Sequence, residues 1–550
     1  MGAVLERIGN WDLRFEQGER SARRDAGEWS GLTLADHLRR QAQDRPDDEA
    51  VIGERMVLRY GEVLEKASAL ARGLLDMGIR PGETISFQLP NWPETVLINA
   101  ACALAGFVIN PVIPIYREAE LRHILRDCRA RVLFIPKRFR GVDYPSMITS
   151  LRDDLPDLDH VAILGDDDDG LERLIRRGHT LDTPLDGADP DSAKLIIYTS
   201  GTTGTPKGVI YSHNQSIRPV NSSFEAWNLG SRARLLMPSP VTHVTGYSYG
   251  IEAPFALGST TIFMEHWDSE RACDLIDSHG VDFMIGATPF LSELIAAAAQ
   301  KGTGLESLRI FGCGGASVPP SVIERAMSTF TNCRAFRVFG SSEAPMITQG
   351  CLEDSVLAAT TDGYINGWEV VVRGEDDAVV RPGQEGEICA KGPSLFRGYT
   401  DPTENPDSFD ADGYFRTGDL GWVDSNGVLT ITGRKKDLII RGGENLSAKE
   451  IEDTLHNHPA IEEAAVVAMR HVRLGEGVAV CLIPAGRDRP DRKVLAAWLE
   501  KQGLARQKWP EYVEYRDTLP KTASGKVQKH LLRRDLAERF PEGYGVVPSN

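Results

Sequence analysis

The segment from Tyr198 to Gly208 combines residue types that suit phosphate binding. It reads Tyr-Thr-Ser-Gly-Thr-Thr-Gly-Thr-Pro-Lys-Gly and follows a short apolar stretch that begins at Leu195. Glycines let backbone N–H groups turn toward an anion, hydroxyl side chains add donors, and a lysine adds a positive charge. The pattern therefore predicts that the phosphates of a nucleotide are bound by Thr199, Ser200, Gly201, Thr202, Thr203, Gly204 and Lys207.

This segment differs from the phosphate loop of the common NTPases. That loop has the pattern G-x-x-x-x-G-K-[ST], in which a hydroxyl residue after the lysine holds magnesium. Here Pro206 precedes the lysine and Gly208 follows it, so that hydroxyl is missing. An ordinary NTPase of that class is not expected.

The segment resembles the signature of the adenylate-forming superfamily, which includes acyl-CoA ligases, peptide-synthetase adenylation domains and firefly-type luciferases. Over roughly residues 30 to 535, four further segments stand in the superfamily's order: Phe339-Gly-Ser-Ser-Glu343, Tyr414-Phe-Arg-Thr-Gly-Asp-Leu-Gly421, Gly433-Arg-Lys-Lys-Asp437 and Leu519-Pro-Lys-Thr-Ala-Ser-Gly-Lys-Val-Gln-Lys529. The resemblance implies ATP-dependent conversion of a carboxylic acid to an acyl-adenylate, followed in most members by transfer to a thiol.

The resemblance implies a nucleotide site built from three of these segments. The ring of Phe339 would lie along adenine and Glu343 would bind Mg²⁺, which prefers hard oxygen ligands and otherwise relies on the nucleotide's own phosphates. Asp419 would accept hydrogen bonds from the ribose hydroxyls, and Arg434 would also reach the ribose. Further contacts with the nucleotide are expected from Gly340, Ser341 and Ser342. Phenylalanine and serine replace the more usual tyrosine and threonine, but the ring and the hydroxyl are kept.

The last segment places Lys526 where the superfamily has its catalytic lysine. A carboxylate and an ATP phosphate repel each other, so their reaction requires neutralised charge and an in-line geometry. By resemblance, Lys526 would lie between these two anions, while Lys207 would accompany pyrophosphate. Lys436 would be the hinge about which a small C-terminal domain rotates after adenylation. Rotation would bring Gly442 and Gly443 to the pantetheine arm of coenzyme A, where glycines permit close approach.

Two segments, 240–247 and 312–317, resemble the walls of the superfamily's acid pocket. They predict contacts with the acid from His243, Val244, Tyr247, Gly315 and Ala316, the last two also reaching the nucleotide. The histidine matches one that many members place beside the substrate carboxylate, although a lone histidine is often only structural.

The same region restricts the class of acid. No aspartate lies between Pro238 and Phe263, so the ammonium group of an amino acid would be buried unpaired. Val244 follows the histidine where hydroxybenzoate-activating members usually have asparagine, which weakens the aryl-acid interpretation. The apolar neighbours favour an acid with an aliphatic, alicyclic or simple aromatic body.

Length and composition indicate a large soluble enzyme. At 550 residues the chain exceeds what one hydrophobic core usually supports, and 41% of it is hydrophobic. The net charge of -17 argues against a nucleic-acid partner. Eight cysteines without a C-x-x-C pair favour reduced thiols and a cytoplasmic location. The most apolar stretch, 96–112, is interrupted by polar residues and is shorter than the roughly 20 residues of a membrane span.

Strand and helix patterns alternate along most of the chain. Helical spacing over 58–77 is followed by a strand at 84–89, and a second helix beginning near Glu94 leads to a strand at 108–112. Such alternation predicts a largely parallel sheet covered on both faces. Short β runs between 370 and 398 predict antiparallel strands or a small barrel. After Asp437 the pattern predicts a compact α+β unit with helices at 448–456 and 492–501 and strands at 461–469 and 477–483.

These observations predict a large α/β N-terminal domain with mainly parallel sheets and a small β-barrel-like part over residues 1–435. A small α+β domain that rotates about a hinge is predicted over 436–550. The predicted function is an acid–CoA ligase that uses ATP, Mg²⁺ and coenzyme A. One alternative is an adenylation enzyme that loads a carrier protein in trans, since the chain ends about two dozen residues after Lys526. A luciferase-like oxygenase is a second alternative, and a homodimer stays open.

Overall fold

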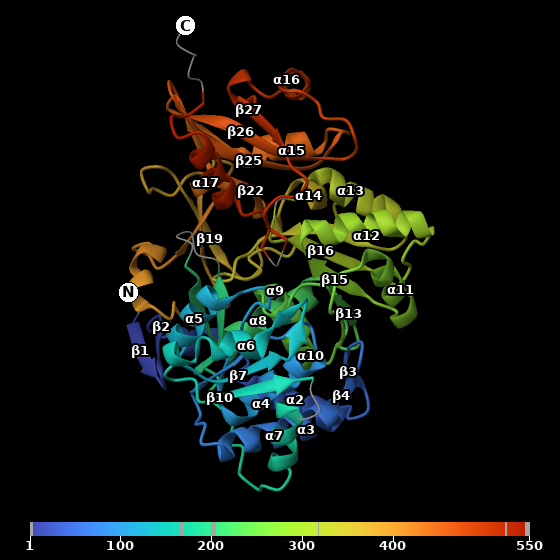
Figure 1. Ribbon diagram of the computed structural model, residues 1–550, viewed down its shortest axis with the longest axis vertical. Helices are drawn as coiled ribbons and strands as arrows, with labels where there is room; N and C mark the ends of the chain where they lie inside the picture. The colour runs from blue at the N-terminus through green and yellow to red at the C-terminus, as the bar shows by residue number, and fades with distance from the viewer. Residues whose placement is uncertain (1–3, 166–168, 200–204, 317, 523–524, 545–550) are drawn as a thin grey trace.

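The computed structural model describes residues 4–165, 169–199, 205–316, 318–522 and 525–544 (Figure 1). One six-stranded sheet has the order β10-β7-β5-β6-β11-β12. Its strands are β10 (His160–Leu164), β7 (Ala130–Pro136), β5 (Thr84–Phe87), β6 (Val108–Pro111), β11 (Ala193–Thr199) and β12 (Lys207–Ser212). Neighbouring strands are parallel except for β11 and β12, which are antiparallel and place Thr199 opposite Lys207. The two ends of the predicted phosphate-binding segment therefore lie side by side.

A second sheet has seven strands in the order β17-β16-β15-β13-β14-β3-β4. They are β17 (Arg334–Val338), β16 (Ile310–Gly314), β15 (Phe283–Gly286), β13 (Arg234–Met237), β14 (Thr260–Phe263), β3 (Glu49–Ile52) and β4 (Val57–Arg59). All neighbours are parallel except β3 and β4. Three helices pack beside β16 and β17: α12 (Thr288–Lys301), α13 (Pro320–Thr329) and α14 (Ser355–Thr360). The segments that carry Gly315 and Phe339 leave the carboxyl ends of β16 and β17, where α/β proteins usually bind ligands.

The core of this part is built around buried helices. In α4 (Pro93–Ala105) every residue except Glu94 is buried, as expected for a helix that is apolar on all sides. It packs against α3 (Tyr60–Asp76), which in turn carries α7 (Gly170–Gly178) on its outer side. The predicted helix at 58–77 and strand at 84–89 are confirmed as α3 and β5, each slightly shorter than expected.

A third sheet is antiparallel throughout and has the order β18-β22-β21-β20-β19. Its strands are β18 (Gly363–Tyr364), β22 (Val428–Arg434), β21 (Phe415–Val423), β20 (Gly386–Lys391) and β19 (Glu369–Arg373). The antiparallel strands expected between 370 and 398 are therefore confirmed. The hairpin of β21 and β22 pairs Asp419 with Arg434 across the two strands.

The C-terminal residues form an α+β unit at one end of the molecule (Figure 1). Its sheet has the order β24-β23-β26-β25, and β27 also pairs with β26. The strands are β23 (Ile439–Arg441), β24 (Glu444–Leu446), β25 (Ile461–His471), β26 (Gly475–Pro484) and β27 (Tyr512–Tyr515), and the helices are α15 (Ala448–His456), α16 (Arg492–Lys501) and α17 (Lys529–Arg539). The expected helices at 448–456 and 492–501 coincide with α15 and α16.

The predicted fold class is confirmed in its α/β and α+β parts. The boundary predicted at residues 435 and 436 falls in the short 3₁₀ helix η5 (Lys435–Asp437), and both this boundary and the rotation stay predictions. All eight cysteines are buried with free thiols. In the described part of the chain, no helix is both long and apolar enough to cross a membrane.

Candidate functional site

A cavity of about 1780 Å³ is lined by residues from the first three sheets, the segments that follow their strands, and the C-terminal unit. Its wall contains most of the residues that the sequence predicts for the site, and these come from segments far apart in the chain. They are Thr199, Lys207, His243, Val244, Gly315, Ala316, Phe339, Gly340, Ser341, Ser342, Glu343, Asp419, Arg434, Lys436 and Lys526. The predicted phosphate contacts of Ser200, Gly201, Thr202, Thr203 and Gly204 lie outside the described residues.

Lys526 reaches this cavity from the segment before α17. Its carbonyl oxygen accepts a hydrogen bond from the N–H of Thr522 at 2.8 Å, and its own N–H donates to Oγ1 of that residue at 3.1 Å. The pKa of Lys526 is lowered to about 8, mainly by burial and also by Arg434, while Asp419 and Glu343 oppose the shift. The ammonium group therefore stands among groups of both charges, and part of its population is neutral near pH 8.

His243 precedes the short helix α9 (Val244–Tyr247) and caps it. Its Nδ1 faces the N–H of Thr245 at 3.5 Å, and its own N–H donates to the carbonyl oxygen of Pro240 at 3.0 Å. Burial, with a smaller contribution from Lys526, lowers the pKa of His243 to about 3. The imidazole is therefore neutral at physiological pH, and its Nε2 carries the proton if Nδ1 accepts from the backbone.

Glu343 follows β17 and is held by an aromatic hydroxyl. Tyr399 donates from its hydroxyl to Oε1 of Glu343 at 3.0 Å, and the carbonyl oxygen of Glu343 accepts from the N–H of Phe396 at 2.9 Å. Among the residues that the structure describes, no cluster of three or more His, Cys, Asp or Glu side chains could hold a metal. A single carboxylate fits Mg²⁺ that takes its other ligands from nucleotide phosphates and water.

Asp419 and Arg434 form an ion pair across the hairpin of β21 and β22. Nε of Arg434 donates to Oδ1 of Asp419 at 2.7 Å. The other carboxylate oxygen, Oδ2, is buried and has no hydrogen-bond partner among the described residues. Burial raises the pKa of Asp419 and Arg434 opposes this shift, while Asp419 raises the pKa of Arg434. An unpaired buried acceptor is costly, and a hydroxyl group of a ligand would satisfy it.

Two contacts at the site involve residues that the sequence analysis did not single out. Lys207 forms an ion pair with Glu404, and its Nζ lies 5.4 Å from the ring centroid of Tyr399. Both partners belong to the segment after β20, nearly 200 residues further along the chain. No local pattern marks them, because their role depends on a long-range contact.

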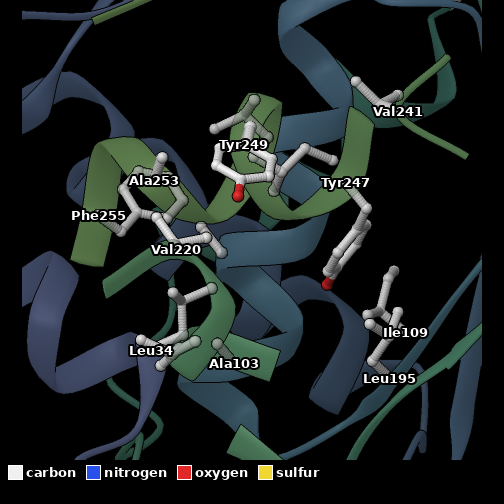
Figure 2. Packing of buried hydrophobic residues seen from close by; sticks show 14 of the residues in the cluster. Leu34, Ala103, Ile109, Leu195, Val220, Val241, Tyr247, Tyr249, Ala253 and Phe255 are labelled. Carbon is white, nitrogen blue, oxygen red and sulfur yellow. The ribbon is translucent and has the colours of Figure 1, made fainter. Parts of the chain in front are cut away.

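Tyr247 does not line the cavity, in contrast to the prediction. Its side chain is fully buried in the core (Figure 2). Its hydroxyl donates to Asn99, and the same oxygen accepts from Nζ of Lys194 at 3.2 Å. The reason is helical geometry. Val244, Thr245, Ser248 and Tyr249 share one face of the helical segment and line the cavity, whereas Tyr247 points to the opposite face.

Gly442 and Gly443 are also absent from the cavity wall. They form the turn between β23 and β24, with φ of +61° and +91°, values that favour glycine. The N–H of Gly442 donates to the carbonyl oxygen of Leu474 at 2.8 Å. In the arrangement described here, the C-terminal unit presents Lys526 to the cavity and keeps this turn elsewhere.

Comparison with known proteins matches most of the chain to two family models. The family model described as AMP-binding enzyme matches residues 38–400, and the model for the AMP-binding enzyme C-terminal domain matches residues 450–526. The medium-chain fatty-acid–CoA ligase of Escherichia coli is 34% identical over 96% of this chain and 95% of its own length. The vibriobactin-specific 2,3-dihydroxybenzoate-AMP ligase of Vibrio cholerae is 30% identical over 93% of this chain and 95% of its own.

Solved structures with similar folds include ATP-bound MatB from Rhodopseudomonas palustris. It has a TM-score of 0.82 and 25% identity, and the match covers 92% of this chain and 100% of that one. The two family models include the strands of the first two sheets and, in the C-terminal unit, Lys526. The chain therefore belongs to the family of AMP-binding enzymes.

Proposed function

We propose that this protein is an acid–CoA ligase. It would convert ATP and a carboxylic acid to an acyl-adenylate and pyrophosphate, and then transfer the acyl group to the thiol of coenzyme A with release of AMP. The observation that carries this proposal is the position of Lys526. A lysine from the C-terminal unit stands at the same cavity as the predicted nucleotide residues Glu343, Asp419 and Arg434. The name of the Escherichia coli relative points to the same reaction.

In the proposed first step, the protein neutralises charge and holds the reactants in line. The ammonium group of Lys526 would lie between the acid's carboxylate and the α-phosphate, where negative charge accumulates in the transition state. Oδ2 of Asp419 is free to accept from a ribose hydroxyl, and the ring of Phe339 would lie along adenine. Mg²⁺ bound at Glu343 would neutralise phosphate charge when present.

In the proposed second step, the C-terminal unit would rotate about Lys436. Lys526 would then leave the cavity, and the turn that contains Gly442 and Gly443 would enter it beside the pantetheine arm. The turn is open at Gly443, where a Cβ atom would meet no other heavy atom within 4 Å, whereas a Cβ atom on Gly442 would lie 3.5 Å from Cδ2 of Leu474. The turn can therefore move without first breaking side-chain contacts at that position.

The acid is proposed to have a mainly apolar body. Val244, Ala316 and Val318 line the cavity near His243, and the neutral imidazole fits a position beside a carboxylate that it binds through Nε2–H. The eight buried free thiols fit a reducing compartment, and we place the enzyme in the cytoplasm.

A carrier protein acting in trans is the second candidate acceptor, because the name of the Vibrio cholerae relative specifies an AMP ligase and does not mention coenzyme A. The two acceptors differ in the product they yield, so one experiment separates them. Pyrophosphate release is measured with short, medium, alicyclic and aryl acids, and the products formed with coenzyme A and with a carrier protein are identified by mass spectrometry. We expect acid-dependent pyrophosphate release and a CoA thioester. Release without a CoA thioester, together with an acylated carrier, would replace the ligase by the loading enzyme.

A further inference from the structure

One wall of the cavity is a helical face that begins at His243 and ends at Tyr249. Between these two residues, Val244, Thr245 and Ser248 also line the cavity. Tyr249 follows His243 by six residues, which corresponds to up to about 9 Å along the segment at the rise of a helix. Because the imidazole is proposed to bind the carboxylate of the acid, Tyr249 lies where the far end of the acid would be.

Tyr249 belongs to the buried core (Figure 2), and an aromatic cluster backs its ring. The ring stacks on Trp227, with the centroids 6.0 Å apart and an interplanar angle of 15°. Trp227 in turn contacts Phe283 and Phe336, with centroid distances of 6.5 and 5.6 Å. These last three rings are buried and take no part in the cavity wall. On this side the cavity therefore ends at the ring of Tyr249, and the close-packed core begins behind it.

Hydrogen bonds fix both ends of the Tyr249 residue. Its hydroxyl shares a hydrogen bond of 2.5 Å with Oγ of Ser223 in α8 (His213–Ala226), and that oxygen also lies 2.9 Å from Oε1 of Gln349. The carbonyl oxygen of Tyr249 accepts from Oγ1 of Thr261 at 3.4 Å. A ring that is stacked on one face and bonded at its tip resists displacement by a longer acid.

The backbone around Tyr249 has an uncommon form. Residues Ser248–Glu252 make the π-helical turn η2, and such turns are rare and occur frequently at functional sites. The end of the turn is held by the buried ion pair of Glu252 with Lys194 in β11, whose side chains are 0% and 2% exposed. The turn therefore keeps Tyr249 in one position at the cavity.

We propose that Tyr249 determines the longest acid that the enzyme accepts. The terminal methyl group of the acid would rest against the ring, and the space beyond the ring is filled. This inference rests on the proposed ligase activity and narrows its substrates to acids that end in a compact apolar group. A polar end is disfavoured, because the hydroxyl of Tyr249 is already bonded to Ser223. One methylene too many in a hydrophobic pocket costs about 10- to 200-fold in kcat/KM.

The test uses two series of acids that lengthen by one methylene at a time. One series runs from butanoate to hexadecanoate, and the other runs from para-methylbenzoate to para-octylbenzoate. The kcat/KM for pyrophosphate release is measured with the wild-type protein and with Tyr249→Ala, Tyr249→Leu and Tyr249→Phe. Phe283→Leu is the matched control, because it removes a ring of the same aromatic cluster without changing the cavity wall.

We expect kcat/KM of the wild-type protein to rise with length up to one acid and to fall at least about tenfold for the next. Tyr249→Leu should move this limit to longer acids, and Tyr249→Ala should move it further, while KM for ATP is unchanged. Tyr249→Phe and Phe283→Leu should keep the wild-type limit. Tyr249→Leu decides the question should the alanine variant fold poorly.

Three results would overturn the role of Tyr249 and leave the ligase intact. They are a wild-type protein without a length limit in either series, a limit that stays in place in Tyr249→Leu, and a limit that moves equally in Phe283→Leu. Absence of pyrophosphate release with every acid would overturn the ligase as well.

Discussion

A Cβ atom on Gly315 would lie 3.5 Å from Cε and 3.9 Å from Nζ of Lys526, so the lysine rests against the glycine backbone. Gly315 follows β16 and has φ of +80°, a conformation that favours glycine. The two residues are more than 200 positions apart and belong to different parts of the fold. Their contact places the ammonium group of Lys526 at the carboxyl end of a parallel sheet, and the first predictions follow from it.

Replacing Lys526 by alanine should separate the two proposed half-reactions. Loss of one preorganised donor at a developing charge costs on the order of a hundred- to a thousandfold in rate, so acid-dependent pyrophosphate release should fall by that factor. Transfer from a supplied acyl-adenylate to coenzyme A should be nearly unchanged, because Lys526 would leave the cavity in the proposed second step. Stopped-flow measurement of both half-reactions checks this.

Lys508→Ala provides the control for charge in the C-terminal unit. Lys508 pairs with Glu450 and does not line the cavity. Its replacement should leave both half-reactions within about twofold of wild type, as usual for a surface ion pair. An equal loss of both half-reactions in Lys526→Ala would contradict the proposal that Lys526 acts in adenylation and not in thiol transfer.

The lowered pKa of Lys526 predicts the pH dependence of adenylation. Burial brings this pKa to about 8, so the free enzyme loses the required ammonium charge as pH rises through 8. The kcat/KM for pyrophosphate release should fall about tenfold per pH unit above that value, whereas an ordinary lysine would place this fall near pH 10.4. The measurement omits coenzyme A, whose thiol ionises in the same range.

Lys526→Arg tests the assignment of this titration. A guanidinium group stays protonated throughout the accessible range, so the variant should have lower activity but no decline above pH 8. A decline that persists in the arginine variant would assign the titration to another group.

Sequence patterns predicted several helices and strands and most of the residues that line the cavity. Helices α3, α15 and α16 and strands β5 and β6 follow from periodicity that is local in the chain. The orientation of Tyr247 could not be predicted, since its segment is too short to define an apolar face. The pairs Tyr399 with Glu343 and Lys194 with Glu252 join residues about 56 and 58 positions apart. Such contacts depend on tertiary packing, which periodicity does not encode.

Asp419→Asn should weaken nucleotide binding with little effect on folding. The carboxylate offers Oδ2 to a ligand hydroxyl, and hydrogen bonds to charged groups are worth about 1.5–3 kcal/mol, so KM for ATP should rise by about 10- to 100-fold. Asp424→Asn is the control, because Asp424 accepts from backbone N–H groups in the turn of the same hairpin and asparagine can do so too. An unchanged KM for ATP in Asp419→Asn would contradict the ribose contact.

Breaking the buried ion pair between Lys194 and Glu252 should strongly destabilise the protein. In Lys194→Met the carboxylate of Glu252 stays buried without its partner, which typically costs about 3–5 kcal/mol in the free energy of unfolding. The double variant Lys194→Met with Glu252→Met should recover most of that loss, because no buried charge remains. Urea unfolding followed by tryptophan fluorescence measures both, with Lys508→Met as the surface control. If Lys194→Met is as stable as the wild-type protein, the ion pair is solvated.

A larger residue at Gly443 should affect only the thiol-transfer step. A Cβ atom there meets no other heavy atom within 4 Å in the present arrangement, so Gly443→Leu should leave acid-dependent pyrophosphate release near the wild-type rate. If the turn later passes close to the pantetheine arm, the added side chain blocks it, and CoA thioester formation should slow by about tenfold or more. Gly503→Leu imposes similar backbone strain, since Gly503 has φ of +86° in the segment after α16, outside the sheet that carries the turn, and a Cβ atom there would also meet no other heavy atom within 4 Å. Because strain alone would slow both variants equally, a selective loss in Gly443→Leu identifies the approach of the turn to the thiol, and equal behaviour of the two variants rejects it.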